Sequence, residues 1–178
     1  MEQSKNEFIN NCIKLEKKIQ KYKLHANLTP RSAFNNTAAN VLRNSDWDII
    51  RGLVYNKYKY KCIICNMEDG EVHAHEFWKY NYKRGIQKLW KIVCLCQLCH
   101  YHQHLGYAQI QIREGNLESG IFIEHWLDIN KATLEDFKIY VKDVFRLWNL
   151  KNLINWKIQL CNGKKFVEAN INDFKKCI

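Results

Sequence analysis

The chain contains few residues that interrupt regular structure: one proline and seven glycines among 178 residues. With 47% hydrophobic and 13% aromatic residues, this composition favours an ordered globular protein and excludes a disordered one. The length suffices for one sizeable core, or for a small metal module with helical additions, and is too short for two ordinary domains. We therefore expect one compact unit with additions at both ends.

A long hydrophobic run is also missing. No segment approaches the roughly 20 apolar residues that a membrane-spanning helix requires, and residues 1–25 lack the apolar stretch of a secretion signal. We therefore expect a cytoplasmic protein, in which thiols stay reduced. On this basis Cys12, Cys161 and Cys177, which stand alone in the sequence, are interpreted as ordinary thiols.

Acidic residues are scarce relative to basic ones, at 18 against 28, which gives a formal net charge of +10. The basic residues are spread along the chain rather than gathered in one tail. Such a balance favours a polyanionic partner, through phosphate contacts and counterion release. Charge alone does not distinguish DNA from RNA, from an acidic protein or from simple solubility.

Hydrophobic periodicity predicts an α+β protein with helices towards both ends. We expect helices at residues 8–24, from Ile49 to about Lys57 with capping by residues 45–48, from Cys99 onwards, 121–127, and 133–148 with a Thr133–Asp136 capping box. Short β-like pieces are expected over residues 58–72, a turn at 66–70, and strands at 72–77, 86–89, 92–95 and 156–158. Residues 107–112 fit a strand or a helix, residues 114–116 a turn, and residues 78–85 a loop.

Four cysteines form two C-x-x-C pairs, Cys62 with Cys65 and Cys96 with Cys99. Each pair places two thiolates on a tight turn with the spacing that tetrahedral zinc requires, and two pairs complete the coordination shell. The pattern predicts a structural zinc ion, because a complete thiolate shell leaves no position for water. Cys94 could compete with Cys96, but the spacing from Cys96 to Cys99 fits better.

Five of the seven histidines lie in or beside the same cysteine-bounded segment; they are His73, His75, His100, His102 and His104. On one helix His100 and His104 are four residues apart and can converge on a cation, whereas His102 is interpreted as a surface or phosphate-facing residue. Phosphodiester hydrolysis needs a metal to stabilise charge and a base to activate water, and this group contains both kinds of side chain.

These motifs resemble those of the HNH endonuclease superfamily, whose ββα-metal (His-Me finger) fold combines a cysteine pair, a histidine-bearing strand and a helix that begins Leu-Cys-x-x-Cys-His. The counterparts here are CIIC, EVHAHEFW and LCQLCHYHQH. The chain is especially similar to a bacterial and phage group with a Trp-Asp-x-Ile-Arg helix, matched by residues 47–51, and a His-x-His-Glu-x-Trp strand, matched by residues 73–78. The resemblance covers most of residues 30–160.

The resemblance implies an N-terminal helical extension (residues 1–45), a zinc-braced HNH nuclease core (46–110) and a mainly helical C-terminal extension (111–178) that packs on the core. It further implies a metal-dependent endonuclease of bacterial or phage origin, acting on nucleic acid with double-stranded DNA as the expected substrate. Because one HNH site cuts one strand per engagement, double-strand cleavage would favour a homodimer.

The catalytic residues implied by the resemblance are His75, Glu76 and His73. His100 and His104, together with a strand residue, would hold a catalytic divalent cation, which is magnesium or manganese with zinc as the alternative. Two registers stay open: His75 is the general base, or His75 is a metal ligand and Glu76 occupies the position of the base. The family's central asparagine has no clear counterpart; Gln87 is a candidate, and Lys91 has the approximate spacing.

Basic residues in and beside the loop at residues 78–85 are candidates for phosphate contacts, and they are Lys79, Lys83, Arg84 and Lys88. Lysines that alternate with Tyr58 and Tyr60 offer a second basic and aromatic segment. Two competing functions remain: a zinc-stabilised nucleic-acid-binding module whose catalytic centre has decayed, and a zinc module for protein interaction.

Overall fold

The computed structural model describes residues 2–68 and 70–178. Backbone proximity groups these residues into two compact units: the chain up to Leu28 with Leu98–Leu153, and Thr29–Gln97 with Ile154–Ile178. The predicted turn over residues 66–70 includes Asp69, which lies outside the described residues. The α+β class predicted from the sequence is confirmed, whereas the three-part division around a nuclease core stays a prediction.

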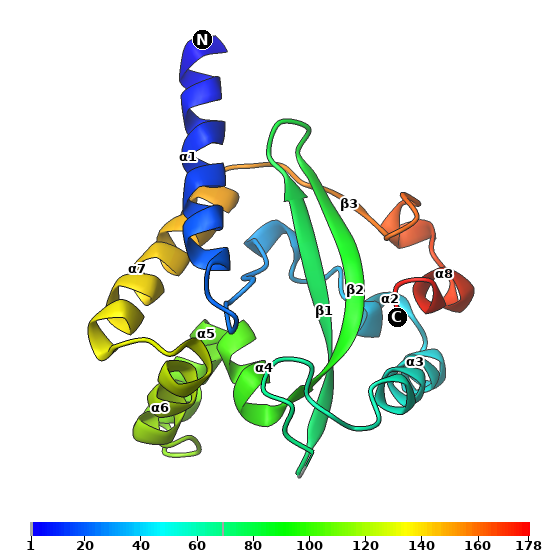
Figure 1. Ribbon diagram of the computed structural model, residues 1–178. Coiled ribbons are helices and arrows are strands. Elements are labelled where there is room, and N and C mark those ends of the chain that lie inside the picture. The colour runs from blue at the N-terminus through cyan, green and yellow to red at the C-terminus, as the bar shows by residue number, and fades with distance from the viewer. Residues whose placement is uncertain (1, 69) are drawn as a thin grey trace. The chain divides into compact units, whose positions relative to one another are not determined.

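The second unit contains a small sheet with the order β1-β2-β3 (Figure 1). Strands β1 (Val72–Asn81) and β2 (Ile86–Cys96) form an antiparallel hairpin, and β3 (Lys157–Gln159) pairs with β2 in parallel. The loop predicted at residues 78–85 is therefore wrong, since only residues 82–85 form a turn. Alternating aromatic and polar side chains continue the strand pattern up to Asn81, and Gly85 turns the chain with a φ of 60°.

The two faces of the hairpin differ in composition. Trp78, Leu89 and Ile92 lie on one face and belong to a buried cluster that includes Ile50 and Val54 of α3 (Asn44–Lys57). Because side chains alternate along a strand, His73 and His75 lie on the opposite face. One face of the hairpin therefore contributes to this buried cluster, and the opposite face carries the histidines beside the buried Val93 and Leu95.

Two expectations around α3 are wrong. Residues 45–48 do not cap the helix, because α3 begins before them, at Asn44, with Arg43 at the N-cap position and Asp46 in the first turn. The described residues over 58–71 form turns and irregular segments instead of the expected β-like pieces, and β1 begins at Val72. Lys59, Tyr60 and Asn66 have φ values of 52°, 58° and 64°, which a strand does not allow.

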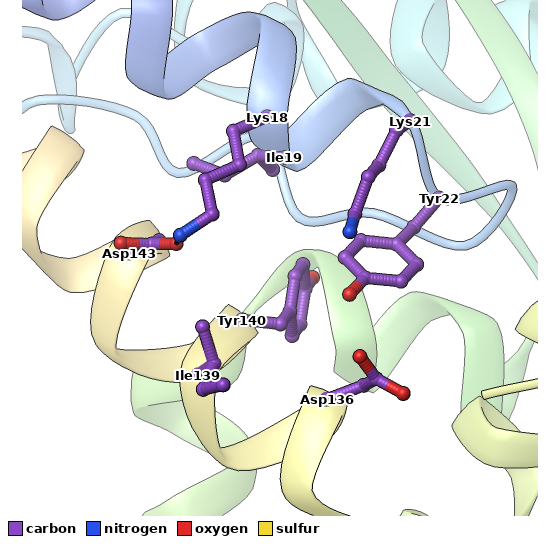
Figure 2. Close-up of a pocket in the computed structure, with 8 residues that line it drawn as sticks. All are labelled: Lys18, Ile19, Lys21, Tyr22, Asp136, Ile139, Tyr140 and Asp143. Atoms are coloured by element: carbon purple, nitrogen blue, oxygen red, sulfur yellow. Dashed lines mark ion pairs between the residues drawn. The ribbon is translucent and has the colours of Figure 1, made fainter. Parts of the chain in front are cut away.

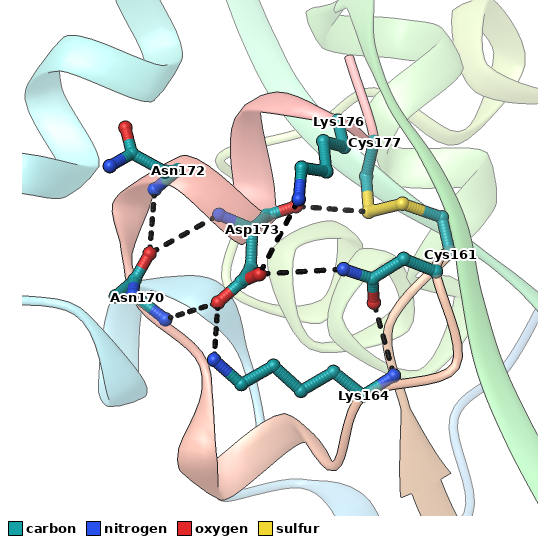
Figure 3. Close-up of polar contacts among 8 residues, drawn as sticks. Cys161, Lys164, Asn170, Asn172, Asp173, Lys176 and Cys177 are labelled. Carbon is teal, nitrogen blue, oxygen red and sulfur yellow. Dashed lines mark hydrogen bonds and ion pairs between the residues drawn. A yellow bond between two sulfur atoms is a disulfide. The ribbon is translucent and has the colours of Figure 1, made fainter.

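The second unit also contains short helices near its two ends: η1 (Arg31–Ala33), α2 (Ala38–Val41), η2 (Phe166–Glu168) and α8 (Ile171–Lys175). A disulfide joins Cys161 to Cys177, so the interpretation of these two cysteines as ordinary thiols is wrong. Figure 3 shows the polar contacts beside it, which centre on Asp173. Its carboxylate accepts hydrogen bonds from Lys164 Nζ (2.7 Å) and the Asn170 amide (3.2 Å), which lower its pKa.

The first unit is helical. It contains α1 (Glu2–Gln20), most of α4 (Gln97–Gln103), α5 (Leu105–Arg113), α6 (Ser119–Asn130) and α7 (Leu134–Lys151). In its core, Trp126 packs against Phe137 and Tyr140. The Tyr140 hydroxyl accepts a 2.7 Å hydrogen bond from the Ala26 amide. The capping box predicted from Thr133 and Asp136 is confirmed.

The remaining helix predictions hold in type and shift in extent, and the ambiguous residues 107–112 are helical. Within residues 2–68 and 70–178, none of the helices has the length and apolar character needed to cross a bilayer.

Candidate metal centres

The first pair of cysteines lies on a tight turn that follows α3. The Cys62 amide donates to the Met67 carbonyl (3.0 Å), and the Asn66 amide donates to the Cys62 carbonyl (2.9 Å). The Ile63 amide donates to the Cys94 carbonyl (3.1 Å), which ties the turn to β2. The second pair is local to one junction, because Cys96 ends β2 and Cys99 lies in the first turn of α4.

The four sulfur atoms of Cys62, Cys65, Cys96 and Cys99 all lie within 4.8 Å of one another, and those of Cys65 and Cys96 are 3.5 Å apart. Tetrahedral zinc, with Zn–S bonds of about 2.3 Å, holds its sulfurs roughly 3.8 Å apart. The four cysteines therefore form a group suited to a structural zinc ion.

Cys94 is not part of this group. It lies with the buried cluster on the core face of the hairpin, and burial, with the nearby Cys62, raises the pKa of its thiol to about 11. The preference for Cys96 over Cys94, made on spacing, agrees with this arrangement.

One histidine that the sequence patterns did not single out also contacts the cysteines. The His125 Nε2 of α6 lies 3.2 Å from the Cys99 sulfur, within hydrogen-bonding distance. A ring N–H that donates to a metal thiolate fixes its orientation and tunes its basicity. His125 lies 26 residues after Cys99, on α6, and no local spacing connects the two residues.

A second group brings together His75, His100 and His104, with one ring nitrogen of each within 4.8 Å of the others. The rings of His100 and His104 have centroids 4.7 Å apart. The expectation that both lie on one continuous helix is wrong, because α4 ends at Gln103 and His104 is the N-cap of α5, with φ −117° and ψ 55°. The two rings nevertheless meet at this break.

Neither His73 nor Glu76 belongs to the histidine group. His73 lies two residues before His75 on the same face of β1. Glu76 faces the other way, where its carboxylate accepts a hydrogen bond from the Ala38 amide at the start of α2. Burial raises the pKa of Glu76 to about 7, against the opposing effect of the Ala38 hydrogen bond.

His102 is not a surface residue, so its interpretation as a phosphate-facing side chain is wrong. The ring is fully buried, stacks on Phe122 at 3.8 Å between centroids and bonds the Phe122 carbonyl through Nε2 (2.9 Å). Burial lowers its pKa to about 3, which keeps the ring neutral. His102 is therefore a core residue of the first unit.

The candidate substrate-binding residues are spread over the hairpin rather than gathered in a loop. Lys79 lies on β1 and Lys88 opposite it on β2, whereas Lys83 and Arg84 lie on the exposed turn between the strands. Gln87 pairs with Tyr80 and is fully buried on the core face, away from the face of His75.

A separate pocket of about 180 Å³ lies between α1 and α7 in the first unit (Figure 2). Lys18 and Asp143 form an ion pair on its wall, and Tyr22 and Tyr140 line its other side. None of its lining residues belongs to either candidate metal group.

No family model matches the chain, and no curated protein or solved structure is significantly similar to it.

Proposed function

We propose that the protein is a metal-dependent endonuclease of the HNH type, with a ββα-metal core and double-stranded DNA as its main substrate. The observation that carries this proposal is the convergence of His75, His100 and His104 in a chain that also holds four cysteines suited to zinc. These residues come from a hairpin followed directly by a helix, which is the order of elements expected for such a core. The net charge of +10 supports a polyanionic substrate.

The two open registers differ in the role of His75, and the geometry favours a ligand role, since its ring nitrogen lies with those of His100 and His104. A divalent cation bound there would stabilise negative charge on the phosphate and on the leaving oxygen. His73 is then the candidate base on the same face of β1. Glu76 is less suited, because its carboxylate is buried against the Ala38 amide.

Three imidazole nitrogens also bear on the choice of cation. Magnesium prefers oxygen ligands, whereas imidazole suits transition ions such as zinc. We therefore rank zinc or manganese above magnesium as the cation that supports cleavage.

Cleavage of supercoiled plasmid, by metal-stripped protein resupplied with magnesium, manganese or zinc, tests the proposal. We expect metal-dependent cleavage that His75→Ala and His104→Ala abolish. Gln109→Ala, an exposed substitution on α5, is the matched control and should cleave as the wild type does. Retention of the structural zinc in each variant would show that the fold is intact.

The competing function is a zinc-stabilised binding module without catalysis. It predicts plasmid binding without cleavage under every metal, and that result would replace the nuclease proposal.

A further inference from the structure

The hairpin face that carries His75 continues as a row of aromatic and basic side chains. The rings of His75 and Phe77 have centroids 5.5 Å apart. The Lys91 Nζ lies 5.7 Å from the Phe77 ring centroid and 4.5 Å from that of Trp90, and the Lys79 Nζ lies 4.0 Å from the Trp90 centroid. We call Phe77, Lys79, Trp90 and Lys91 the hairpin row; all four lie within the second unit.

A β-bulge creates the middle of this row. Phe77 pairs with Lys91 and Trp78 pairs with Leu89, which leaves Trp90 as the extra residue. Leu89 and Ile92 both belong to the core, so the bulge places two consecutive residues, Trp90 and Lys91, on the other face. Trp90 is 47% exposed there.

The row carries positive charge, and the lysines around it form no ion pair with the carboxylates that the structure describes. The ammonium groups of Lys79 and Lys91 both lie over the Trp90 ring. Burial and the positive charges of Lys57 and Lys79 lower the pKa of Lys91. Lys88 lies directly opposite Lys79 in the register.

We propose that the hairpin row binds unpaired nucleotides of a single-stranded polynucleotide. A base packs on the exposed Trp90 ring, and the ammonium groups of Lys79 and Lys91 pair with the flanking phosphates. A regular duplex would offer only its backbone, because paired bases hide their faces in the stack. An acidic peptide would use the lysines but would gain nothing from the aromatic ring.

The proposal deepens the proposed function, since the row begins beside His75 and a strand bound along it would lead to that residue. The proposed binding of single strands depends only on residues of the hairpin, and not on cleavage. A nuclease that engages the row would act on, or open, an unpaired segment of its substrate.

Fluorescence anisotropy with labelled oligothymidylate and oligouridylate tests the row, in a His104→Ala background that prevents cleavage. Trp90→Leu should weaken binding about tenfold, and Trp90→Tyr should retain most of the affinity, because stacking of one base contributes roughly that factor. Lys79→Gln combined with Lys91→Gln should reduce the slope of log affinity against log salt by about 1.4, since each single-strand phosphate contact contributes about 0.7.

The matched controls are Phe34→Leu, which removes another exposed aromatic ring of the same unit, and Lys142→Gln combined with Lys175→Gln. All should bind as the parent does. The thymidylate and uridylate arms show whether the sugar matters, and stacking predicts similar losses in both. Both Trp90→Tyr and Trp90→Leu remove the indole, and only Trp90→Tyr keeps an aromatic ring, so a folding defect from loss of the indole would appear in both variants.

Unchanged affinity of Trp90→Leu would overturn the proposal, as would an equal loss on a blunt duplex or displacement of the oligonucleotide by polyglutamate at an equal concentration of charge. The plasmid assay stays independent. Single-strand binding by a protein that cleaves no plasmid would contradict the proposed nuclease function and support binding by the hairpin row. Plasmid cleavage together with normal binding by Trp90→Leu would contradict binding by the row and support the nuclease function.

Discussion

The amide of Ile92 donates a 2.7 Å hydrogen bond to the carbonyl of Cys177, which also forms the disulfide with Cys161. The C-terminal segment is thus attached to the strand that ends in Cys96, through both a backbone hydrogen bond and a covalent closure. Because Ile92 and Cys177 are buried in one cluster, loosening of the C-terminus would expose part of the same core.

Removal of the disulfide should destabilise the protein substantially. The double variant Cys161→Ala and Cys177→Ala should lose about 3 kcal/mol in free energy of unfolding, because the bridge closes a loop with a sequence separation of 16. Chemical denaturation measures this loss. Reductant should lower the free energy of unfolding of the wild type towards that of the variant, and should leave the stability of the variant unchanged. Two free thiols at these positions in the untreated wild type would contradict the prediction.

Loss of one ligand should release the structural zinc. We expect one fewer zinc ion per chain in Cys65→Ser, because three thiolates leave the shell incomplete, together with a lower melting temperature. Elemental analysis of the purified protein measures the metal content. Cys94→Ala is the matched control: it removes a buried thiol outside the group and should retain zinc despite some lost packing. Equal zinc in both variants would disprove the assignment.

The buried Lys151 should make stability depend on pH. Its side chain is 3% exposed, and burial lowers its pKa to about 8, against the opposing effects of Glu16 and Cys12. The unfolded chain, with the ordinary lysine pKa near 10.4, binds more protons between these values, so stability should rise from about pH 8 to pH 10. The total rise is on the order of 3 kcal/mol, at about 1.4 kcal/mol for each pKa unit.

Lys151→Met should therefore stabilise the protein at pH 7 and flatten this rise. Denaturation curves at several pH values, compared between variant and wild type, isolate the contribution of Lys151 from other titrating groups. Lys142→Met, an exposed position on the same helix, should keep the wild-type slope. A parallel pH dependence of Lys151→Met and the wild type would show that this lysine is not desolvated.

The capping box at the start of α7 should contribute measurably to stability. Thr133→Ala removes the side chain that accepts from the Asp136 amide (3.2 Å) and donates to its carboxylate (2.7 Å), and should cost about 1 kcal/mol. Ser119→Ala, at the first residue of α6 where no side-chain cap is present, should change the free energy of unfolding by about a few tenths of a kcal/mol at most. Urea denaturation of the two variants provides the comparison.

The features that the sequence predicted correctly depend on neighbours close in the chain. The Thr133 cap and the paired cysteines are local patterns, and each requires only a few residues to be recognisable. The end of β1 at Asn81 differs from the sequence prediction, because aromatic and lysine residues that alternate fit a strand and an exposed loop equally well. Residues 78–81 form a strand because they pair with residues 86–89 of β2, which are separate in the sequence pattern.

Other features depend on residues far apart in the chain. The buried His102 bonds the carbonyl of Phe122 through Nε2, and His125 reaches Cys99 across 26 residues. The bond between Cys161 and Cys177 likewise follows from how the C-terminal segment returns to β2. Composition and spacing contain no sign of these contacts, because tertiary packing creates them.

Because Trp90 is the extra residue of a β-bulge, the presence of its exposed indole and the pairing of β1 with β2 can change independently. Pairing of Phe77 with Lys91 and of Trp78 with Leu89 does not involve Trp90, so deletion of this one codon would join the two paired stretches in the same alignment. A lineage can therefore acquire or discard the exposed indole in a single mutational event, while the strand that carries His75 keeps its facing. We expect homologous chains with and without this residue to share the fold of the hairpin and to differ in their affinity for polynucleotides.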